Sequence, residues 1–363
     1  MNILIDIAHP AHVHVTKNTY WELTKKGHKV YVTVKDIPSA VALLDKYEIP
    51  YIHLGGKKDS LRGKALLQVM YNLKIWWLVL TKRIDVGFSS SITPAHISRI
   101  SGMRSIIIDD DDDEVEPLFV KYGHPYADVV LSPACAIRST KKMIPYAGYH
   151  ELAYLHPNRF TPDPSVLKEI GVKEGETYFI LRFNAFKAHH DVGVLGLSIE
   201  NKRKLIKDLE KRGKVFITTE RNIDEEFKPY QLLVSPEKVH SLIYYATMLI
   251  GDSQTMTSEA AVLGTPAIRC NTFVGRISYL EEEEHTYNLT YGFLPTDSEA
   301  MFAKIEELLA LPDLKAIWQD RRENMLKDKI DVTAFFVWFI ENYPGSAKEM
   351  REPQAPKGDV KKW

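Results

Sequence analysis

The sequence predicts an α/β fold built from two doubly wound domains that face a cleft. The chain has 363 residues, which is too long for one ordinary hydrophobic core and suits two domains of about 150 residues each. Short β-rich runs alternate with helical patterns, and this alternation indicates βαβ units and parallel sheets. A stretch with three prolines, 157–164, divides the alternation into two series.

The first series begins with an apolar, β-rich run at the start of the chain. Two of the helical patterns that follow end at Gly27 and Gly102, since glycine commonly stops a helix. The expected strands are 2–8, 28–34, 50–54, 85–89, 104–108 and 127–132, the last being the final strand of this domain. The expected helices are 15–26, 40–47, 64–82 and 95–101.

The second series follows the proline-rich stretch and repeats the same alternation. Its expected strands are 178–183, 215–219, 248–251 and 267–270. Its expected helices are 199–212, 236–246, 255–263, 298–311, 314–327 and 333–342. The residues from Gly345 onward carry Pro353, Pro356 and mixed charges, so we expect a flexible tail at 345–363.

The composition excludes several classes of protein. Hydrophobic residues make up 45% and charged residues 26% of the chain, as in folded proteins. The formal net charge is -1, which disfavours a nucleic-acid binder. Only Cys135 and Cys270 are present, so a reducing compartment is the simpler interpretation. The most apolar run, 65–80, is too short and too polar for a membrane span, and the start lacks a secretory signal. We expect a cytoplasmic protein.

The strongest motif is the segment 251–266, where a strand ends, small polar residues follow, and an Ala-rich helix begins. Ser253 can cap the helix, while Gly264 and Pro266 can end it. The unpaired first-turn amides of such a helix bind phosphate groups. Glu259 lies about one turn further, where its carboxylate can accept two ribose hydroxyls. The alternative is an ordinary capped helix without a ligand.

This segment resembles the donor-binding motif of GT-B-fold sugar-nucleotide enzymes, including the lipid II-forming N-acetylglucosaminyltransferase and UDP-N-acetylglucosamine 2-epimerase. The whole chain resembles a prokaryotic glycosyltransferase-like family with two Rossmann-like domains. The resemblance implies that Ser253, Gln254 and Thr255 bind diphosphate and that Glu259 binds the ribose. It also implies that the apolar C-terminal helix, 331–344, crosses back to pack on the first domain.

Three histidines follow the first strand, at His9, His12 and His14. Histidine titrates near neutral pH and can serve as a general base toward a sugar hydroxyl. Ala11-His12-Val13 is similar to the Gly-His-Val of the lipid II-forming enzyme, which favours His12. The alternatives are helix capping, a packed histidine and, less favoured, a zinc site.

Seven acids lie in the eight residues 109–116, directly after an apolar strand. Neighbouring carboxylates repel one another, so most of the run is expected to form a solvated loop. Asp110, near the carboxyl end of the strand, is a candidate base or a partner that orients a histidine. A shared divalent cation is an alternative.

The end of strand 178–183 and the loop after it carry basic side chains that could bind the phosphates of the sugar donor. Arg182 has a planar guanidinium suited to phosphate, and Lys187 and His190 add donors. A polar hinge loop without a ligand is the alternative interpretation.

The helix 64–82 carries apolar residues at helical spacing, with basic residues around it. Such a pattern favours a core helix, and the alternative is a helix that lies in a membrane interface and presents a lipid-linked acceptor. The apolar positions are Leu66, Leu67, Val69, Met70, Leu73, Trp76, Trp77 and Leu80.

The leading hypothesis is therefore a glycosyltransferase without a metal cofactor, acting in surface polysaccharide or glycolipid synthesis. A nucleoside diphosphate sugar, UDP-linked in the first instance, would bind domain 165–330, and a carbohydrate or lipid-linked acceptor would bind domain 1–160. His12, or alternatively Asp110, would deprotonate the acceptor, and Arg182 would stabilise the departing diphosphate. The location would be cytoplasmic or peripheral on the inner face of the membrane.

Two alternatives remain open. One is an epimerase acting on UDP-N-acetylglucosamine, although Ser89-Ser90-Ser91 and Arg182-Phe183-Asn184 stand where that family carries acidic and His-Arg motifs. The other is a module that binds a nucleotide sugar without catalysis, suggested by the lack of glycine in the loop after the first strand.

Overall fold

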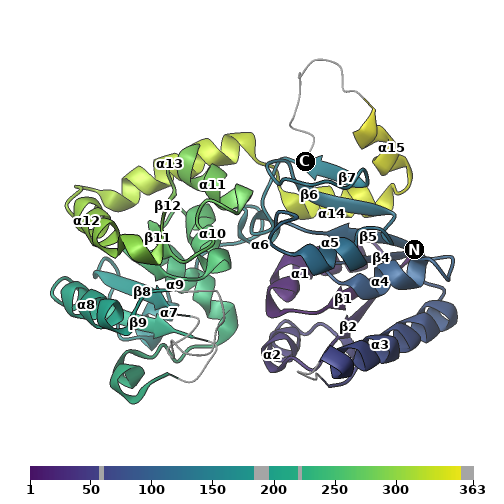
Figure 1. Cartoon of the computed structure of the whole chain (residues 1–363), viewed down its shortest axis with the longest axis horizontal. Coiled ribbons are helices and arrows are strands. Elements are labelled where there is room, and N and C mark those ends of the chain that lie inside the picture. Colours follow the sequence, from purple (N-terminus) through teal and green to yellow (C-terminus); the bar gives the residue numbers. More distant parts are fainter. Residues whose placement is uncertain (57–60, 184–195, 220–222, 353–363) are drawn as a thin grey trace. The chain divides into compact units, whose positions relative to one another are not determined.

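The computed structural model describes residues 1–56, 61–183, 196–219 and 223–352. The chain forms two compact units (Figure 1). Unit 1 comprises Met1–Arg159 and Lys329–Trp363, and unit 2 comprises Phe160–Asp328. Each unit holds one parallel sheet with helices packed on it, which confirms the predicted α/β class.

Unit 1 contains a seven-stranded sheet in the order β3-β2-β1-β4-β5-β6-β7. Its strands are β1 (Asn2–Ile7), β2 (Lys29–Val34), β3 (Tyr51–His53), β4 (Val86–Ser89), β5 (Arg104–Ile108), β6 (Val129–Pro133) and β7 (Met143–Tyr146). Its helices are α1 (Pro10–Lys25), α2 (Pro38–Lys46), α3 (Leu61–Lys82), α4 (Ile92–Ser98), α5 (Pro117–Tyr122), α6 (Leu152–Leu155), α14 (Val332–Glu341) and α15 (Gly345–Arg351). The strand order reverses between β1 and β4, where such sheets bind ligands beyond their carboxyl ends.

Unit 2 contains a five-stranded sheet in the order β12-β11-β10-β8-β9. Its strands are β8 (Tyr178–Arg182), β9 (Lys214–Thr218), β10 (Met248–Gly251), β11 (Ala267–Cys270) and β12 (Thr290–Phe293). Its α-helices are α7 (Val166–Glu169), α8 (Ile199–Glu210), α9 (Val239–Tyr245), α10 (Gln254–Leu263), α11 (Ser278–His285), α12 (Ser298–Leu309) and α13 (Leu314–Asp328). Three short 3-10 helices are η1 (Glu225–Tyr230), η2 (Pro236–Lys238) and η3 (Pro295–Asp297). Here the order reverses between β8 and β10.

Two strands that the sequence pattern missed lie at sheet edges. β7 follows β6, so 127–132 is not the last strand of its domain, and β12 was not expected at all. β7 contains Pro145, which lacks a backbone donor and is tolerated at an edge. β12 is only half-buried and contains Gly292, so it lacks the apolar run of a central strand.

The C-terminal helix α14 packs on the first unit, as the resemblance implied. It contacts α1 and α6, and its Phe336 ring lies 5.1 Å from the ring of Phe88 on β4. Asp331 caps the helix by accepting the Ala334 amide at 3.0 Å, and the Arg159 guanidinium donates to the same carboxylate. These buried contacts tie the chain end into unit 1.

The prediction of a flexible tail from Gly345 is wrong for its first seven residues, Gly345–Arg351, which form α15. Ser346 and Ala347 are buried, and the Ser346 hydroxyl donates to the Phe339 carbonyl at 2.8 Å. The two prolines and mixed charges suggested disorder, but the small residues Ser346 and Ala347 on one face of this helix are buried, and α15 packs on α14.

Within the part of the chain that the structure describes, no helix is long and apolar enough to cross a membrane.

Candidate functional site

The start of α10 in unit 2 has the geometry predicted for a phosphate-binding helix. The Ser253 hydroxyl caps it by accepting the Met256 amide at 3.3 Å. The first backbone hydrogen bond of the helix runs from the Thr257 amide to the Ser253 carbonyl. The amides of Gln254 and Thr255 precede it and therefore have no acceptor within the helix. Gly264 ends the helix with φ +67°, as predicted from its position before Thr265-Pro266.

Strand pairing brings Arg182 beside this helix start. Arg182 ends β8 and pairs in register with Gly251, the last residue of β10. The Asp252 amide donates to the Arg182 carbonyl at 3.0 Å, and a Cβ on Gly251 would lie only 2.1 Å from that oxygen. The Arg182 side chain is buried and donates to Thr218 on β9. Lys187 and His190, the other predicted cations, lie outside the described residues.

A second cation at this edge was missed from the sequence. Lys202, on α8, is buried, and its ammonium lies 4.9 Å from the Phe183 ring centre. Burial lowers the pKa of Lys202, while the nearby carboxylates of Asp252 and Asp224 act in the opposite direction. In sequence it is one of several lysines on a charged helix, so only the fold distinguishes it.

Glu259 is buried within α10 and paired. His240, on α9, contacts its carboxylate through Nε2 at 2.9 Å, and the Phe160 ring packs edge-on against the imidazole. The acid that the resemblance assigns to the ribose is thus held in place by a histidine that sequence analysis did not single out. No short motif joins the two residues, which come from neighbouring helices.

The three histidines after β1 have three different environments. His9 caps α1 by accepting the Ala11 amide at 3.3 Å, and His14 is buried and stacked on Tyr154. His12 accepts the Ala8 amide at Nδ1, also at 3.3 Å. Capping and packing therefore account for His9 and His14, and His12 is left facing the polar cluster described next.

Burial lowers the pKa of His12 to about 3, and the nearby rings of His9 and His150 add to the effect. The imidazole is therefore neutral near pH 7. Since Nδ1 accepts a hydrogen bond, its proton lies on Nε2, and His12 presents a donor.

The acidic run is only in part the solvated loop that the sequence favoured: Glu114 and Glu116 are exposed, whereas 109–113 is buried or half-buried. Asp109 is buried and contacts His124 at 2.8 Å and Arg138 at 2.7 Å. Asp112 is buried as well and accepts the Ile137 amide, and Asp113 accepts the Ser139 amide. Repulsion among the acids is offset by Arg138 and by backbone amides of the loop between β6 and β7. Those partners lie about 25 residues further along the chain.

Asp110 forms a pair with His150, a histidine that no sequence motif indicated. Asp110 Oδ1 lies 3.1 Å from His150 Nδ1, and both the imidazole and Tyr146 pack against Phe336 of α14. Burial raises the pKa of Asp110, but the charge and hydrogen bond of His150 outweigh it and lower the pKa. An ionised Asp110 therefore accepts the Nδ1 proton and fixes the His150 tautomer.

Three buried polar atoms near Asp110 have no hydrogen-bond partner among the described residues: His150 Nε2, Tyr146 Oη and Arg138 Nη2. Burial, followed by the negative charge of Asp110, raises the pKa of Tyr146. Buried polar groups are almost always paired, so these three atoms can still bond to an ordered water or a polar ligand. The cluster stands at the carboxyl ends of β5, β6 and β7.

Asp111 and Glu116 are two further carboxyl groups beside this cluster. Burial, followed by repulsion from Asp110 and other acids, raises the pKa of Asp111 to about 8. Burial and repulsion from Asp109 and Asp110 raise the pKa of Glu116 as well. Within the described ranges, no three His, Cys, Asp or Glu side chains are grouped so as to hold a metal ion.

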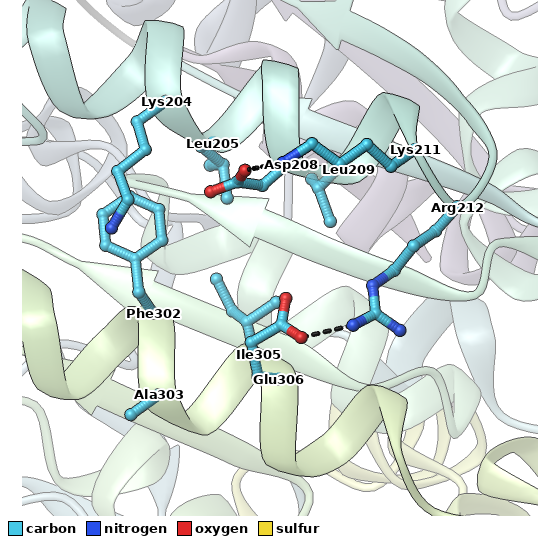
Figure 2. Close-up of a pocket in the computed structure, with 10 residues that line it drawn as sticks. All are labelled: Lys204, Leu205, Asp208, Leu209, Lys211, Arg212, Phe302, Ala303, Ile305 and Glu306. Carbon is cyan, nitrogen blue, oxygen red and sulfur yellow. Dashed lines mark hydrogen bonds and ion pairs between the residues drawn. The ribbon is translucent and has the colours of Figure 1, made fainter.

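A cavity of about 410 Å³ lies between α8 and α12 of unit 2. Figure 2 shows four of its charged residues in pairs, Arg212 with Glu306 and Lys211 with Asp208, and Lys204 over the Phe302 ring. Arg212 is followed closely by Lys214, the first residue of β9, so the cavity lies toward the amino ends of the strands. Ligands of such sheets bind at the opposite edge, where Arg182 and Ser253 lie.

A sequence profile assigns the chain to a family. The family described as "Protein of unknown function (DUF354)" matches residues 1–288. The chain belongs to the DUF354 family. A relative in Methanocaldococcus jannaschii, the uncharacterized protein MJ0665, is 21% identical over 305 residues, covering 78% of this chain and 86% of the relative.

Solved structures with the same fold include enzymes of sugar-nucleotide chemistry. MnaA of S. aureus, solved with UDP, has a TM-score of 0.68 at 10% identity, over 99% of this chain and 100% of that chain. A UDP-N-acetylglucosamine 2-epimerase has a TM-score of 0.66 at 13% identity, over 99% of this chain and 98% of that chain. The spinosyn rhamnosyltransferase SpnG has a TM-score of 0.64 at 11% identity, over 94% and 100%. This DUF354 chain therefore has the GT-B fold that its motif predicted.

Proposed function

We propose that this chain is a glycosyltransferase that moves a sugar from a nucleoside diphosphate sugar, UDP-linked, to an acceptor hydroxyl. The observation that carries the proposal is the pairing of Arg182 with Gly251, which places the end of β8 beside the capped start of α10 where the strand order reverses. A carboxylate, Glu259, lies about one turn further along the same helix. Similar folds solved with UDP and with thymidine diphosphate support the choice of ligand.

On the donor side, the amides of Gln254 and Thr255 and the Ser253 hydroxyl would bind the diphosphate. Arg182 and Lys202 would place positive charge near the oxygen that becomes negative as the sugar leaves, which stabilises the transition state. Glu259, held by His240, would accept the ribose hydroxyls. These protein donors supply the charge stabilisation, so the proposed reaction includes no metal ion.

On the acceptor side, the Asp110–His150 pair would remove the proton from the acceptor hydroxyl. When neutral and bonded to Asp110 through Nδ1–H, His150 would carry its lone pair on Nε2, which has no partner among the described side chains. His12, first choice from the sequence, would instead donate from Nε2 to an acceptor oxygen, because its pKa of about 3 makes it a weak base. The acceptor would be a carbohydrate or a lipid-linked sugar, in surface polysaccharide or glycolipid synthesis.

The test measures donor binding by calorimetry, after a thermal-shift comparison of nucleoside diphosphates has chosen the base. A nucleotide present at 100 times its Kd should stabilise the protein by about 2.7 kcal/mol. Glu259→Ala should weaken binding of the chosen nucleotide by about 10- to 100-fold, as expected for losing hydrogen bonds to a charged group. Glu299→Ala, an exposed acid on α12, is the matched control and should bind normally. Equal affinity in the Glu259 variant would refute the donor site.

An epimerase is the second candidate, because a UDP-N-acetylglucosamine 2-epimerase shares the fold over nearly the whole chain. Incubation with UDP-N-acetylglucosamine alone separates the two hypotheses. A transferase leaves the sugar configuration unchanged without an acceptor, whereas an epimerase produces the 2-epimer. A module that binds without catalysis would give neither the epimer nor transfer to any acceptor.

A further inference from the structure

The outer face of helix α3 is apolar along most of its length. The inner face packs into the unit 1 core through Tyr71, Ile75 and Val79, as the sequence pattern favoured. The outer face does not belong to the core, although the sequence pattern favoured a core helix. It carries six large apolar side chains that are 39–65% exposed: Leu66, Val69, Met70, Leu73, Trp77 and Leu80. We call these six residues the α3 stripe.

The spacing of the α3 stripe places it on one side of the helix. Counted from Leu66, its members follow at positions +3, +4, +7, +11 and +14, which span about 100° around the axis and about 21 Å along it. Exposed apolar residues are ordinarily scattered singly, and a continuous stripe marks a contact surface. Trp77, the most exposed member, has an apolar ring and a polar N–H, a combination enriched at membrane–water interfaces.

The charge of the segment indicates the chemistry of the partner. The sequence 61–84 contains five basic residues and no Asp or Glu. Lys82 and Arg83 are exposed at the carboxyl end of the helix, whereas the ammonium of Lys74 donates to the Leu54 carbonyl at 2.7 Å. Anionic lipid headgroups attract such a helix while its apolar side chains enter the acyl boundary.

We propose that the α3 stripe docks unit 1 on an anionic lipid surface, with α3 lying in the plane of the interface. The helix does not cross the bilayer, since it is not apolar enough for a span. Contact with a second copy through the same stripe is disfavoured, because a two-fold axis would place two all-cationic segments against each other. The proposal stands independently of the transferase activity and goes beyond it.

Flotation of the full-length protein with vesicles tests the proposal. Phosphatidylcholine vesicles that contain phosphatidylglycerol should bind the protein, and pure phosphatidylcholine should bind it much less. The double variant Leu73→Ser/Trp77→Ser should reduce partitioning of the protein onto vesicles at least about tenfold, because two apolar side chains that would be buried in the lipid are replaced by polar ones. Lys82→Glu/Arg83→Glu should also reduce binding, as should raising the salt from about 0.1 M to about 1 M.

Leu118→Ser is the matched control, since Leu118 is 69% exposed on α5 of the same unit. It should bind vesicles like the native protein. Because all these positions are exposed, the thermal midpoints should agree, which excludes misfolding. Equal binding to neutral and anionic vesicles, or no effect of the stripe variant, would overturn the proposal. So would a dimer seen by ultracentrifugation that the stripe variant abolishes, in the absence of vesicle binding.

Discussion

Two carboxylate–histidine pairs, Glu259–His240 in unit 2 and Asp110–His150 in unit 1, are built in opposite senses. In unit 2, His240 contacts Glu259 through Nε2 at 2.9 Å. In unit 1, His150 contacts Asp110 through Nδ1 at 3.1 Å and leaves Nε2 unpartnered among the described residues. The difference indicates that the histidine positions the acid in unit 2, whereas the acid positions the histidine in unit 1.

The largest effect should come from the unit 1 pair. His150→Gln should reduce transfer about 10²- to 10⁴-fold, the usual contribution of a general base, while the nucleotide affinity stays unchanged. Asp110→Asn should also reduce kcat, because the amide no longer fixes the Nδ1–H tautomer. Release of nucleoside diphosphate measures turnover, and calorimetry measures donor binding.

Nitrogen NMR of the imidazoles gives a readout that does not depend on activity. The native protein should show His150 protonated at Nδ1, and Asp110→Asn should change this signature. Transfer that survives in His150→Gln would remove His150 as the base. Loss of donor binding in the same variant would indicate general damage rather than a role in proton transfer.

The unit 2 pair should give a smaller effect, seen in binding. His240→Gln should weaken nucleotide binding by about tenfold or less, since Glu259 is retained but loses the imidazole that orients it. His240→Ala removes the hydrogen bond altogether and should approach the Glu259→Ala value. Calorimetry on both variants checks this order. A larger loss in kcat than in affinity would assign the unit 2 histidine a chemical role and remove the contrast between the pairs.

The difference between the pairs also explains which parts of the site the sequence predicted. Ser253 and Glu259 lie six residues apart on one capped helix, so a local motif contains both of them. Asp110 and His150 are 40 residues apart, and Phe336, which packs on His150, comes from the far end of the chain. No local pattern connects these three segments.

The same reasoning applies to the fold. The central strands are apolar runs and were predicted almost to the residue, for example β5 at Arg104–Ile108. The edge strands β7 and β12 have weaker patterns and were missed, whereas the edge strands β3 and β9 were predicted. Burial of the acidic run could not be foreseen either, because the residues that neutralise Asp109 come from outside the run.

His12 separates the sequence-based hypothesis from the structural one. Asn at this position retains an acceptor for the Ala8 amide, so the loop should keep its conformation. His12→Asn should reduce kcat by less than about tenfold, the loss of one neutral hydrogen bond, and leave the pH dependence of kcat unchanged. A loss as large as that in His150→Gln, with a shifted pH profile, would return the role of base to His12.

The smallest effect concerns stability, and it is specific to the acidic cluster of unit 1. The pKa of Asp111 is raised to about 8, so the folded state holds this proton more tightly than the unfolded state. Stability then falls as pH rises from about 4 to about 8, where the unfolded state releases the proton first. Asp111→Asn removes this cost and should raise the free energy of unfolding by about 1–2 kcal/mol at pH 8, with little change at pH 4. Chemical denaturation at the two pH values measures the difference.

Glu299→Asn, on the surface of unit 2, should show no such pH-dependent gain. An equal gain at both pH values would mean that the charge of Asp111 does not destabilise the folded state. Unit 1 would then lack the crowded carboxyl groups that distinguish its pair from that of unit 2.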